Sequence, residues 1–252
     1  MKNIEVKVLS SRSTFEEIES LACLAARITQ RGHKIKKMED LDNLFEGFLD
    51  GDREQMLERL VDLPHPTLQK LGTVTVAIIG ASRRFLAQIT RHQNETKFMS
   101  ASLQYSDYSG ESNFVIPYDL LGYEEEIEEY LEGCRASANL YEDLICDRFG
   151  NDDAGYVMPQ SLRGALLISA TPYQFKHMIR QRVCRRNTSE TRYVMLKVWD
   201  ELLKKSPILF KDCVPTCFYG DCIEKNMTCG AYLEYDNPED ILKKDFKKVY
   251  ND

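Results

Sequence analysis

The chain has 252 residues, of which 43% are hydrophobic and 29% charged, a composition that supports a sizeable buried core and excludes a disordered or collagen-like polypeptide. Forty acidic against 33 basic side chains give a net charge of −7, which argues against sequence-independent binding of nucleic acid by the whole chain. No apolar stretch approaches the roughly 20 residues that cross a bilayer, and residues 1–5 lack the apolar core of a signal peptide. We expect a cytoplasmic protein without nucleic-acid or membrane partners.

Periodic patterns predict short strands and helices in the first half of the chain. Partial alternation over residues 4–9 predicts a strand, and apolar residues at helical spacing predict a helix over residues 14–30. Residues 40–62 predict one or two helices, divided at Gly51. A β-branched strand is predicted over residues 73–79, a helix over residues 82–92, and another strand over residues 114–116.

The second half is mainly helical by the same criterion. Residues 123–149 form the longest helical pattern, and residues 174–185 and 190–205 also predict helices. Periodicity leaves the apolar run 162–170 unassigned. Strands and helices without regular βαβ alternation predict an α+β fold, a single domain over residues 1–233 with a mixed sheet packed by helices. Residues 234–252 have few apolar anchors, which predicts a loosely held C-terminal tail.

A local basic segment over residues 174–192 stands out in this acidic chain. Only Glu190 opposes its six cations, which are Lys176, Arg180, Arg182, Arg185, Arg186 and Arg192. If the helix continues, Arg182 and Arg186 share a face, where two guanidinium groups suit a phosphate or carboxylate. A solvated basic face is the alternative, and composition does not decide between them.

A second polar segment, residues 88–93 with residues 100–106, predicts a pocket rich in hydrogen-bond donors and acceptors. A lone histidine on a helix, such as His92, is more often structural than catalytic. The sequence contains no nucleophile elbow, phosphate-binding Gly-rich loop or His-Glu metal motif. A bound cofactor could supply the missing chemistry.

Four short motifs follow one another in the order known from one enzyme family. The early ones are Ala26-Arg27-Ile28-Thr29 and His65-Pro66-Thr67. The third is Gln88, then Arg91-His92-Gln93 and Ser102-Leu103-Gln104-Tyr105, against a family signature of Arg-His-Arg with a spaced Ser-x-Arg. The fourth is Arg182-x-Cys184-x-Arg186 with Glu190 and Arg192, against Arg-x-Cys-x-Arg-Ala-Gln-Trp-Glu-x-Arg. Over about residues 20–230 the chain therefore resembles the flavin-dependent thymidylate synthases.

This resemblance implies a homotetramer that binds FAD and dUMP. Methylenetetrahydrofolate would donate a one-carbon unit, NADPH would reduce the flavin, and reduced flavin would deliver hydride as dTMP forms. Arg182 takes the position of the arginine that activates the pyrimidine electrostatically. The implied cofactor contacts are Thr67, Arg91, His92, Gln93 and His177. The implied nucleotide contacts are Gln88, Arg91, Ser100, Ser102, Leu103, Gln104 and Arg182.

Several positions depart from the family pattern. They are Gln93 and Gln104 for arginine, Ser100 for glutamate, Gly155 for a nucleotide-binding arginine, and Thr171 and Tyr173 for an Asn-x-Arg pair. Losing a charge-assisted contact costs about 1.5–3 kcal/mol, which weakens dUMP binding roughly tenfold or more. Three hypotheses stay open: a divergent dTMP-forming flavoenzyme, an enzyme of the same fold that uses another pyrimidine nucleotide or leaves a hydroxymethyl group, and a non-catalytic nucleotide- or metal-binding relative.

Eight cysteines in a reducing compartment favour free thiols or metal ligands over structural disulfides. The early ones, Cys23, Cys134 and Cys146, lie in helical patterns typical of small buried hydrophobes. In the late cluster, Cys217, Cys222 and Cys229, joined by Cys184 or Cys213, predict a tetrahedral zinc site that would brace residues 209–230. Free thiols and a disulfide are the alternatives.

Overall fold

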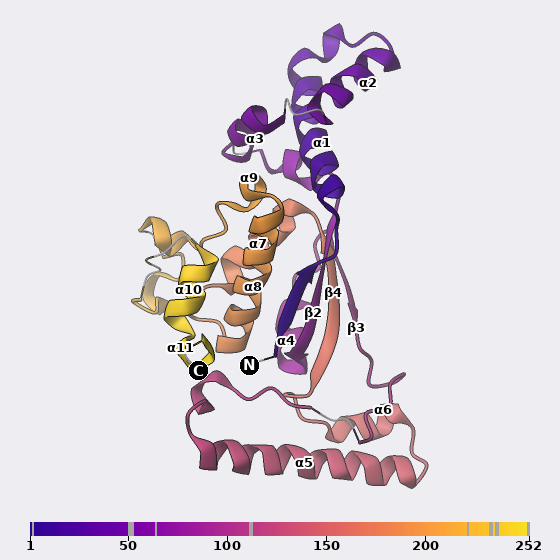
Figure 1. Ribbon diagram of the computed structural model, residues 1–252, viewed down its shortest axis with the longest axis vertical. Coiled ribbons are helices and arrows are strands. Elements are labelled where there is room, and N and C mark those ends of the chain that lie inside the picture. The colour runs from indigo at the N-terminus through magenta and orange to yellow at the C-terminus, as the bar shows by residue number, and fades with distance from the viewer. Residues whose placement is uncertain are drawn as a thin grey trace.

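A four-stranded antiparallel sheet forms the centre of the fold. The computed structural model describes residues 1, 3–49, 53–63, 65–110, 113–220, 222–231, 234 and 237–250. The strands are β1 (Glu5–Val8), β2 (Val74–Ser82), β3 (Thr96–Ser100) and β4 (Arg163–Ala170), in the spatial order β1-β2-β4-β3 (Figure 1). The predicted α+β class is confirmed. The sheet was expected to be mixed, but each pair of neighbouring strands among the described residues is antiparallel.

One face of the sheet carries the core, because successive strand residues point to opposite faces. Val8 pairs with Val76, Val76 with Ile168, and Ile168 with Phe98, so one row of apolar side chains crosses all four strands. Val8, Val76 and Ile168 are buried, and Phe98 packs against the same cluster.

A bulge at Gly80 interrupts the regular pairing near the end of β2. The register shifts between Ile79 and Ala81, and Gly80 has a φ of 80°. A Cβ at this position would lie 2.7 Å from the Asn3 carbonyl oxygen, so both the space and the backbone conformation require glycine. The strand then ends at Ser82, whose hydroxyl accepts from the Phe85 amide at 3.1 Å and caps helix α4 (Arg83–Ile89).

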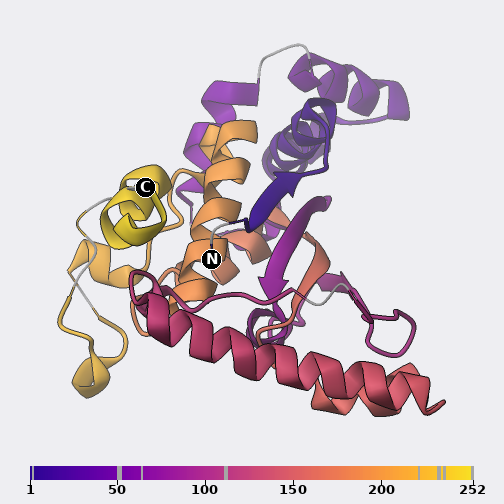
Figure 2. The same cartoon turned by 60° about the horizontal axis from the view of Figure 1, so that its bottom comes forward.

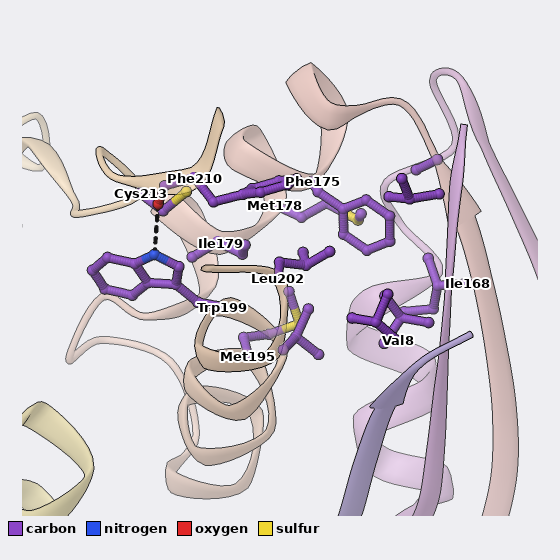
Figure 3. Packing of buried hydrophobic residues seen from close by; sticks show 14 of the residues in the cluster. Val8, Ile168, Phe175, Met178, Ile179, Met195, Trp199, Leu202, Phe210 and Cys213 are labelled. Atoms are coloured by element: carbon purple, nitrogen blue, oxygen red, sulfur yellow. Dashed lines mark hydrogen bonds between the residues drawn. The ribbon is translucent and has the colours of Figure 1, made fainter. Parts of the chain in front are cut away.

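Helices cover the core face of the sheet. These are α4, α7 (Pro172–Arg182) and α8 (Ser189–Lys205), whereas α1 (Arg12–Arg31) extends beyond the end of the sheet (Figure 1). All four helices lie close to the ranges predicted from helical spacing. Figure 3 shows Phe175 and Met178 of α7 and Leu202 of α8 packed near Val8 and Ile168 of the sheet. Trp199, which is fully buried, donates from Nε1 to the Phe210 carbonyl at 2.8 Å.

Further helices extend from both ends of this centre. Helices α2 (Met38–Gly47) and α3 (Arg53–Val61) confirm the two-helix version of the prediction, although Gly51 lies outside the described residues. At the opposite end lie α5 (Glu124–Cys146) and α6 (Asn151–Ala154) (Figure 2). Buried residues of these helices form a second apolar cluster around Tyr141. The strand predicted over residues 114–116 is wrong: in that range Phe114 makes only an isolated bridge to Leu162.

Short 3₁₀ helices complete the fold. They are η1 (Gly32–Lys34), η3 (Pro66–Lys70), η4 (Tyr118–Leu120), η5 (Gly155–Val157), η6 (Thr216–Tyr219) and η7 (Lys225–Met227). In the described ranges, every helix is too short or too polar to cross a membrane.

The C-terminal segment is packed against the helical layer. It contains α10 (Pro238–Asp245) and α11 (Lys247–Tyr250), which follow α9 (Pro207–Phe210). Ile241, Leu242 and Phe246 are 1%, 4% and 1% exposed, and the Phe246 ring lies 5.3 Å from that of Tyr193 on α8. The prediction of a loosely held tail is therefore wrong, because three apolar anchors in correct register are enough to bury one face of a short helix.

Candidate active site

Arg182 is held at the carboxyl end of α7 by three neutral acceptors. Its Nε donates to His92 Nε2 at 2.8 Å, its Nη1 to Asn187 Oδ1 at 3.1 Å and its Nη2 to the Gln88 carbonyl at 2.9 Å. Burial, followed by the charge of Arg91, lowers the pKa of Arg182. Within the described ranges no carboxylate pairs with it. Its positive charge is oriented but not neutralised.

His92 is the neutral partner that fixes the Arg182 guanidinium. The residue is 7% exposed, and burial, then the charges of Arg182 and His177, lower the pKa of His92 to about 4. It is therefore uncharged at neutral pH, with Nε2 as the acceptor and the proton on Nδ1. The His177 ring lies 5.9 Å away at 78°. His92 thus acts in support of Arg182 and not as a charged group.

The other arginines of the basic segment are engaged in structural contacts. Arg185 and Arg192 both pair with Asp245 of α10, at 3.0 Å and 2.5 Å. Arg180 donates to the Asp212 carbonyl at 2.6 Å and 2.9 Å. These contacts link α7 and α8 to the C-terminal region, and they distinguish Arg182 from its neighbours.

Arg182 and Arg186 do not share a helix face. Helix α7 ends at Arg182, so the chain turns before Arg186, which donates from Nη1 to the Met227 carbonyl at 2.7 Å. The continuing helix on which the shared face depended is therefore absent, although Arg182 and Arg186 both line one cavity of about 540 Å³. The turn instead brings Asn187 back onto Arg182, and Asn187 Nδ2 donates to the Gln181 carbonyl at 2.8 Å.

The residues predicted to line the nucleotide pocket lie at the two ends of α4. Gln88 and Arg91 are at its carboxyl end beside Arg182. Ser100 ends β3 and lies with Ala101 against the amino-terminal part of α4. The loop that follows contains Ser102, Leu103 and Gln104, and Ser102 Oγ accepts from the Gln104 amide at 3.1 Å. At 1.5 Å per residue, α4 separates the two groups by about 10 Å.

The residues predicted to contact the cofactor lie on three adjoining segments. Thr67 is exposed on η3, Gln93 is exposed after α4, and His177 is exposed on α7. Arg91 is also exposed, and His92 lies below it in the interior. Side chains that can interact with a ligand are thus available on each segment.

Glu95 ties these segments together. Its carboxylate accepts from Lys70 Nζ of η3 at 2.9 Å and from Thr171 Oγ1 at the start of α7 at 3.2 Å. Lys70 Nζ also lies 4.9 Å from the centre of the Tyr173 ring. Thr171 and Tyr173, which depart from the family pattern, therefore both make contacts within this chain.

The late cysteines are not gathered into a metal-binding cluster in the part of the chain that the structure describes. In the described part of the chain no three His, Cys, Asp or Glu side chains are arranged to hold a metal ion, and all eight cysteines are free. The described residues thus give no support to the zinc site predicted for Cys184, Cys217, Cys222 and Cys229, which stays a prediction. Cys184, Cys217 and Cys222 line a cavity of about 540 Å³ that also reaches Arg182 and His177. Burial raises the pKa of the Cys184 thiol.

Two residues of the site were not foreseen, Asn187 and Glu95. Asn187 lies within the fourth motif at the family's alanine position, and this substitution was the only sequence signal for it. Glu95 gave no signal, because its partners Lys70 and Thr171 are 25 and 76 residues away along the chain.

The chain matches the family model described as "Thymidylate synthase complementing protein" over residues 11–208. It is 25% identical over 217 residues to the flavin-dependent thymidylate synthase of Geobacter sulfurreducens, covering 86% of this chain and 90% of that protein. It is 26% identical over 211 residues to the enzyme of the same name from Pyrococcus furiosus, covering 81% and 83%.

Solved structures show the same fold. Thymidylate synthase X from Helicobacter pylori, crystallised with FAD and dUMP, has a TM-score of 0.58 at 18% identity over 84% of this chain and 99% of that chain. The UMP/dUMP methylase PolB from Streptomyces cacaoi, bound with 5-Br dUMP, has a TM-score of 0.64 at 15% identity over 83% and 94%. The family match, the two relatives and the shared fold agree, and the chain belongs, as a divergent member, to the flavin-dependent thymidylate synthases, a family of enzymes.

Proposed function

We propose that the protein methylates dUMP to dTMP, with FAD as cofactor, methylenetetrahydrofolate as one-carbon donor and NADPH as reductant. The observation that carries the proposal is the un-neutralised guanidinium of Arg182, held by His92, Asn187 and the Gln88 carbonyl. A cation fixed in this way, and partly removed from water, can stabilise negative charge that develops on a pyrimidine ring. Membership of the flavin-dependent thymidylate synthases supports the same function.

The residues at the cofactor positions fit FAD. Arg91 offers a cation for a phosphate, Thr67 and Gln93 offer hydrogen bonds, and the exposed His177 ring offers a surface for a flat ring system. Gln69 of η3 adds a buried Oε1 that lacks a hydrogen-bond partner in the described ranges of the chain. When bound, FAD supplies the reducing electrons that convert a transferred methylene group into a methyl group.

The chain's own groups would orient the nucleotide and hold its charge. Arg182 would face the pyrimidine, and His92 and Asn187 would fix the plane of its guanidinium, so that no reorganisation is needed as charge develops. Because His92 stays neutral and accepts a hydrogen bond from Arg182 Nε, it leaves the arginine's positive charge available for the substrate.

The test compares dTMP formation by the native protein and by the Arg182→Ala variant. Purified protein would be incubated with dUMP, methylenetetrahydrofolate, FAD and NADPH, and dTMP quantified. Arg182→Ala should lower turnover by about a hundredfold to a thousandfold, the cost of removing one preorganised charge donor. Arg135→Ala is the matched control, since Arg135 lies on α5 and pairs with Glu128 at the exposed surface. Unchanged turnover in Arg182→Ala would contradict the assignment.

A second candidate is the same fold acting on a different pyrimidine nucleotide or leaving a hydroxymethyl group. It is favoured by the packing of Leu103 against Gly155, where the family has a nucleotide-binding arginine. A Cβ at position 155 would lie only 3.1 Å from Leu103 Cβ, so this loop leaves no room for a longer side chain without moving. Parallel assays with dUMP, UMP and dCMP, with mass analysis of the nucleotide product, separate the two candidates. Absence of any co-purified or reconstituted flavin would favour a non-catalytic relative.

Self-association into a homotetramer is part of the proposal. The sheet face opposite the core is open in the single chain, and Ile79, Met99 and Leu167 on it are 49%, 72% and 40% exposed. Neighbouring apolar side chains on an uncovered sheet face are typical of protein–protein contacts. Burial of this face between copies would also place segments of a second chain near the cofactor residues.

A further inference from the structure

A small cavity of about 230 Å³ lies between η3 and α7, beside the exposed ring of His177. Its lining includes Val61, Pro66, Gln69, Lys176, His177 and Arg180. Pockets for whole cofactors are typically about 300–1,000 Å³. This cavity is therefore sized for one group of a larger molecule that lies across His177.

Lys176 is a buried cation without a partner. The residue is 5% exposed, and in the part of the chain that the structure describes its ammonium makes no hydrogen bond or ion pair. Burial, the largest effect, lowers the pKa of Lys176; Cys213, Asp212 and Asp62 oppose this shift, and Arg180 adds to it. None of the acidic groups approaches within ion-pair distance. Burial of an unpaired charge is unfavourable, which points to a ligand anion.

Gln69 supplies a complementary unsatisfied group in the same cavity. The residue is 6% exposed, its Nε2 donates to the Val61 carbonyl at 3.4 Å, and its Oε1 has no hydrogen-bond partner among the described residues. Buried polar atoms in native proteins are nearly always hydrogen-bonded to protein, water or ligand. The cavity is thus lined by a cation without a described partner and by a residue whose buried carbonyl oxygen lacks a described donor.

We propose that this cavity is an anion subsite, in which Lys176 binds a carboxylate or phosphate of an acidic co-substrate and Gln69 Oε1 accepts from an N–H or O–H of the same molecule. The proposal rests on the proposed function, because His177, a predicted cofactor contact, lines the same cavity. Lysine suits this role as a compact point charge that reaches one oxygen. The two sources of such an anion are a glutamyl carboxylate of a reduced folate and the 2′-phosphate of NADPH.

Two matched ligand pairs distinguish these sources. Dissociation constants would be measured by calorimetry for NADPH against NADH, and for tetrahydrofolate with three glutamates against one. The native protein should bind the more acidic member of one pair more tightly, either NADPH more tightly than NADH or the triglutamate more tightly than the monoglutamate. Lys176→Met should reduce that preference at least tenfold while binding FAD as the native protein does. Lys204→Met, which removes an exposed lysine of α8, is the control and should keep the preference.

A second measurement needs neither FAD nor turnover. Acylation of Lys176 by an amine-reactive ester at neutral pH would be followed by peptide mass spectrometry, with Lys204 as internal reference. Inorganic phosphate or glutarate should slow acylation of Lys176 at least threefold and leave Lys204 unchanged. No protection by either anion, or ligand preferences unchanged in both Lys176→Met and Lys176→Gln, overturns the subsite. Protection without FAD or dUMP binding would support the subsite and contradict the proposed function.

Discussion

Replacing His92 with glutamine should change how the stability of the protein depends on pH. Glutamine keeps an acceptor for Arg182 Nε but does not titrate. In the native protein His92 is 7% exposed, and its pKa is lowered from 6.5 to about 4. Between these two values the unfolded chain binds a proton at this position and the folded chain does not. The stability due to neutral His92 is therefore complete above pH 6.5 and is lost as the pH falls toward 4.

The size of the effect follows from this displacement of the pKa. One pKa unit corresponds to about 1.4 kcal/mol. Lowering the pH from 7 to 5 should therefore reduce the free energy of unfolding by about 2 kcal/mol through His92 alone. Other titrating groups also contribute, but they are shared by the native protein and His92→Gln and cancel in the comparison.

Urea unfolding at pH 7 and pH 5 measures this difference directly. Trp199 is the sole tryptophan and is fully buried, so its fluorescence reports unfolding of the core. The native protein should lose about 2 kcal/mol more than His92→Gln between the two pH values. Equal losses of unfolding free energy in the two proteins would show that His92 is not held neutral. His92 could then not be the neutral hydrogen-bond partner of Arg182.

Three further predictions concern the framework around the site. Glu190→Gln should lower the free energy of unfolding, measured in urea, by about 1.5–3 kcal/mol. The Glu190 carboxylate accepts hydrogen bonds from the Ser82 amide at 2.7 Å and the Ser82 hydroxyl at 2.5 Å. An unchanged urea midpoint would contradict this prediction. Asp245→Asn leaves Arg185 and Arg192 without their shared carboxylate. It should lower the free energy of unfolding by about 3 kcal/mol and make the C-terminal segment more susceptible to limited proteolysis. Proteolysis as slow as in the native protein would contradict this role of Asp245. Sedimentation of the flavin-bound protein should give the mass of four chains, and a monomer that retains tight flavin binding would refute the proposed assembly.

Long amphipathic helices and the functional motifs could be predicted from sequence. Helices α1, α5 and α8 carry apolar residues at a regular helical spacing over many turns, and such a repeat needs no knowledge of its partners. The importance of Arg182 came from a motif whose residues lie close together in sequence. Both inferences needed only residues that lie close together along the chain.

Short and edge elements could not be predicted in the same way. The five residues of β3 form a strand because they pair with β4 at the edge of the sheet, from Thr96 opposite Ala170 to Ser100 opposite Leu166. Residues 114–116 look more like a strand, yet Phe114 finds only one bridging partner. Strand formation depends on available neighbours as much as on β-branched composition.

By itself the sequence determined the fold class, the main helices and the residues that carry the family motifs. Only the tertiary structure decided which basic residues are neutralised. It placed Asp245, which the sequence assigned to a loose tail, between Arg185 and Arg192, and it left Arg182 with neutral acceptors alone. Local spacing cannot encode such choices, because the net charge of a site is set by side chains that folding brings together from distant parts of the chain.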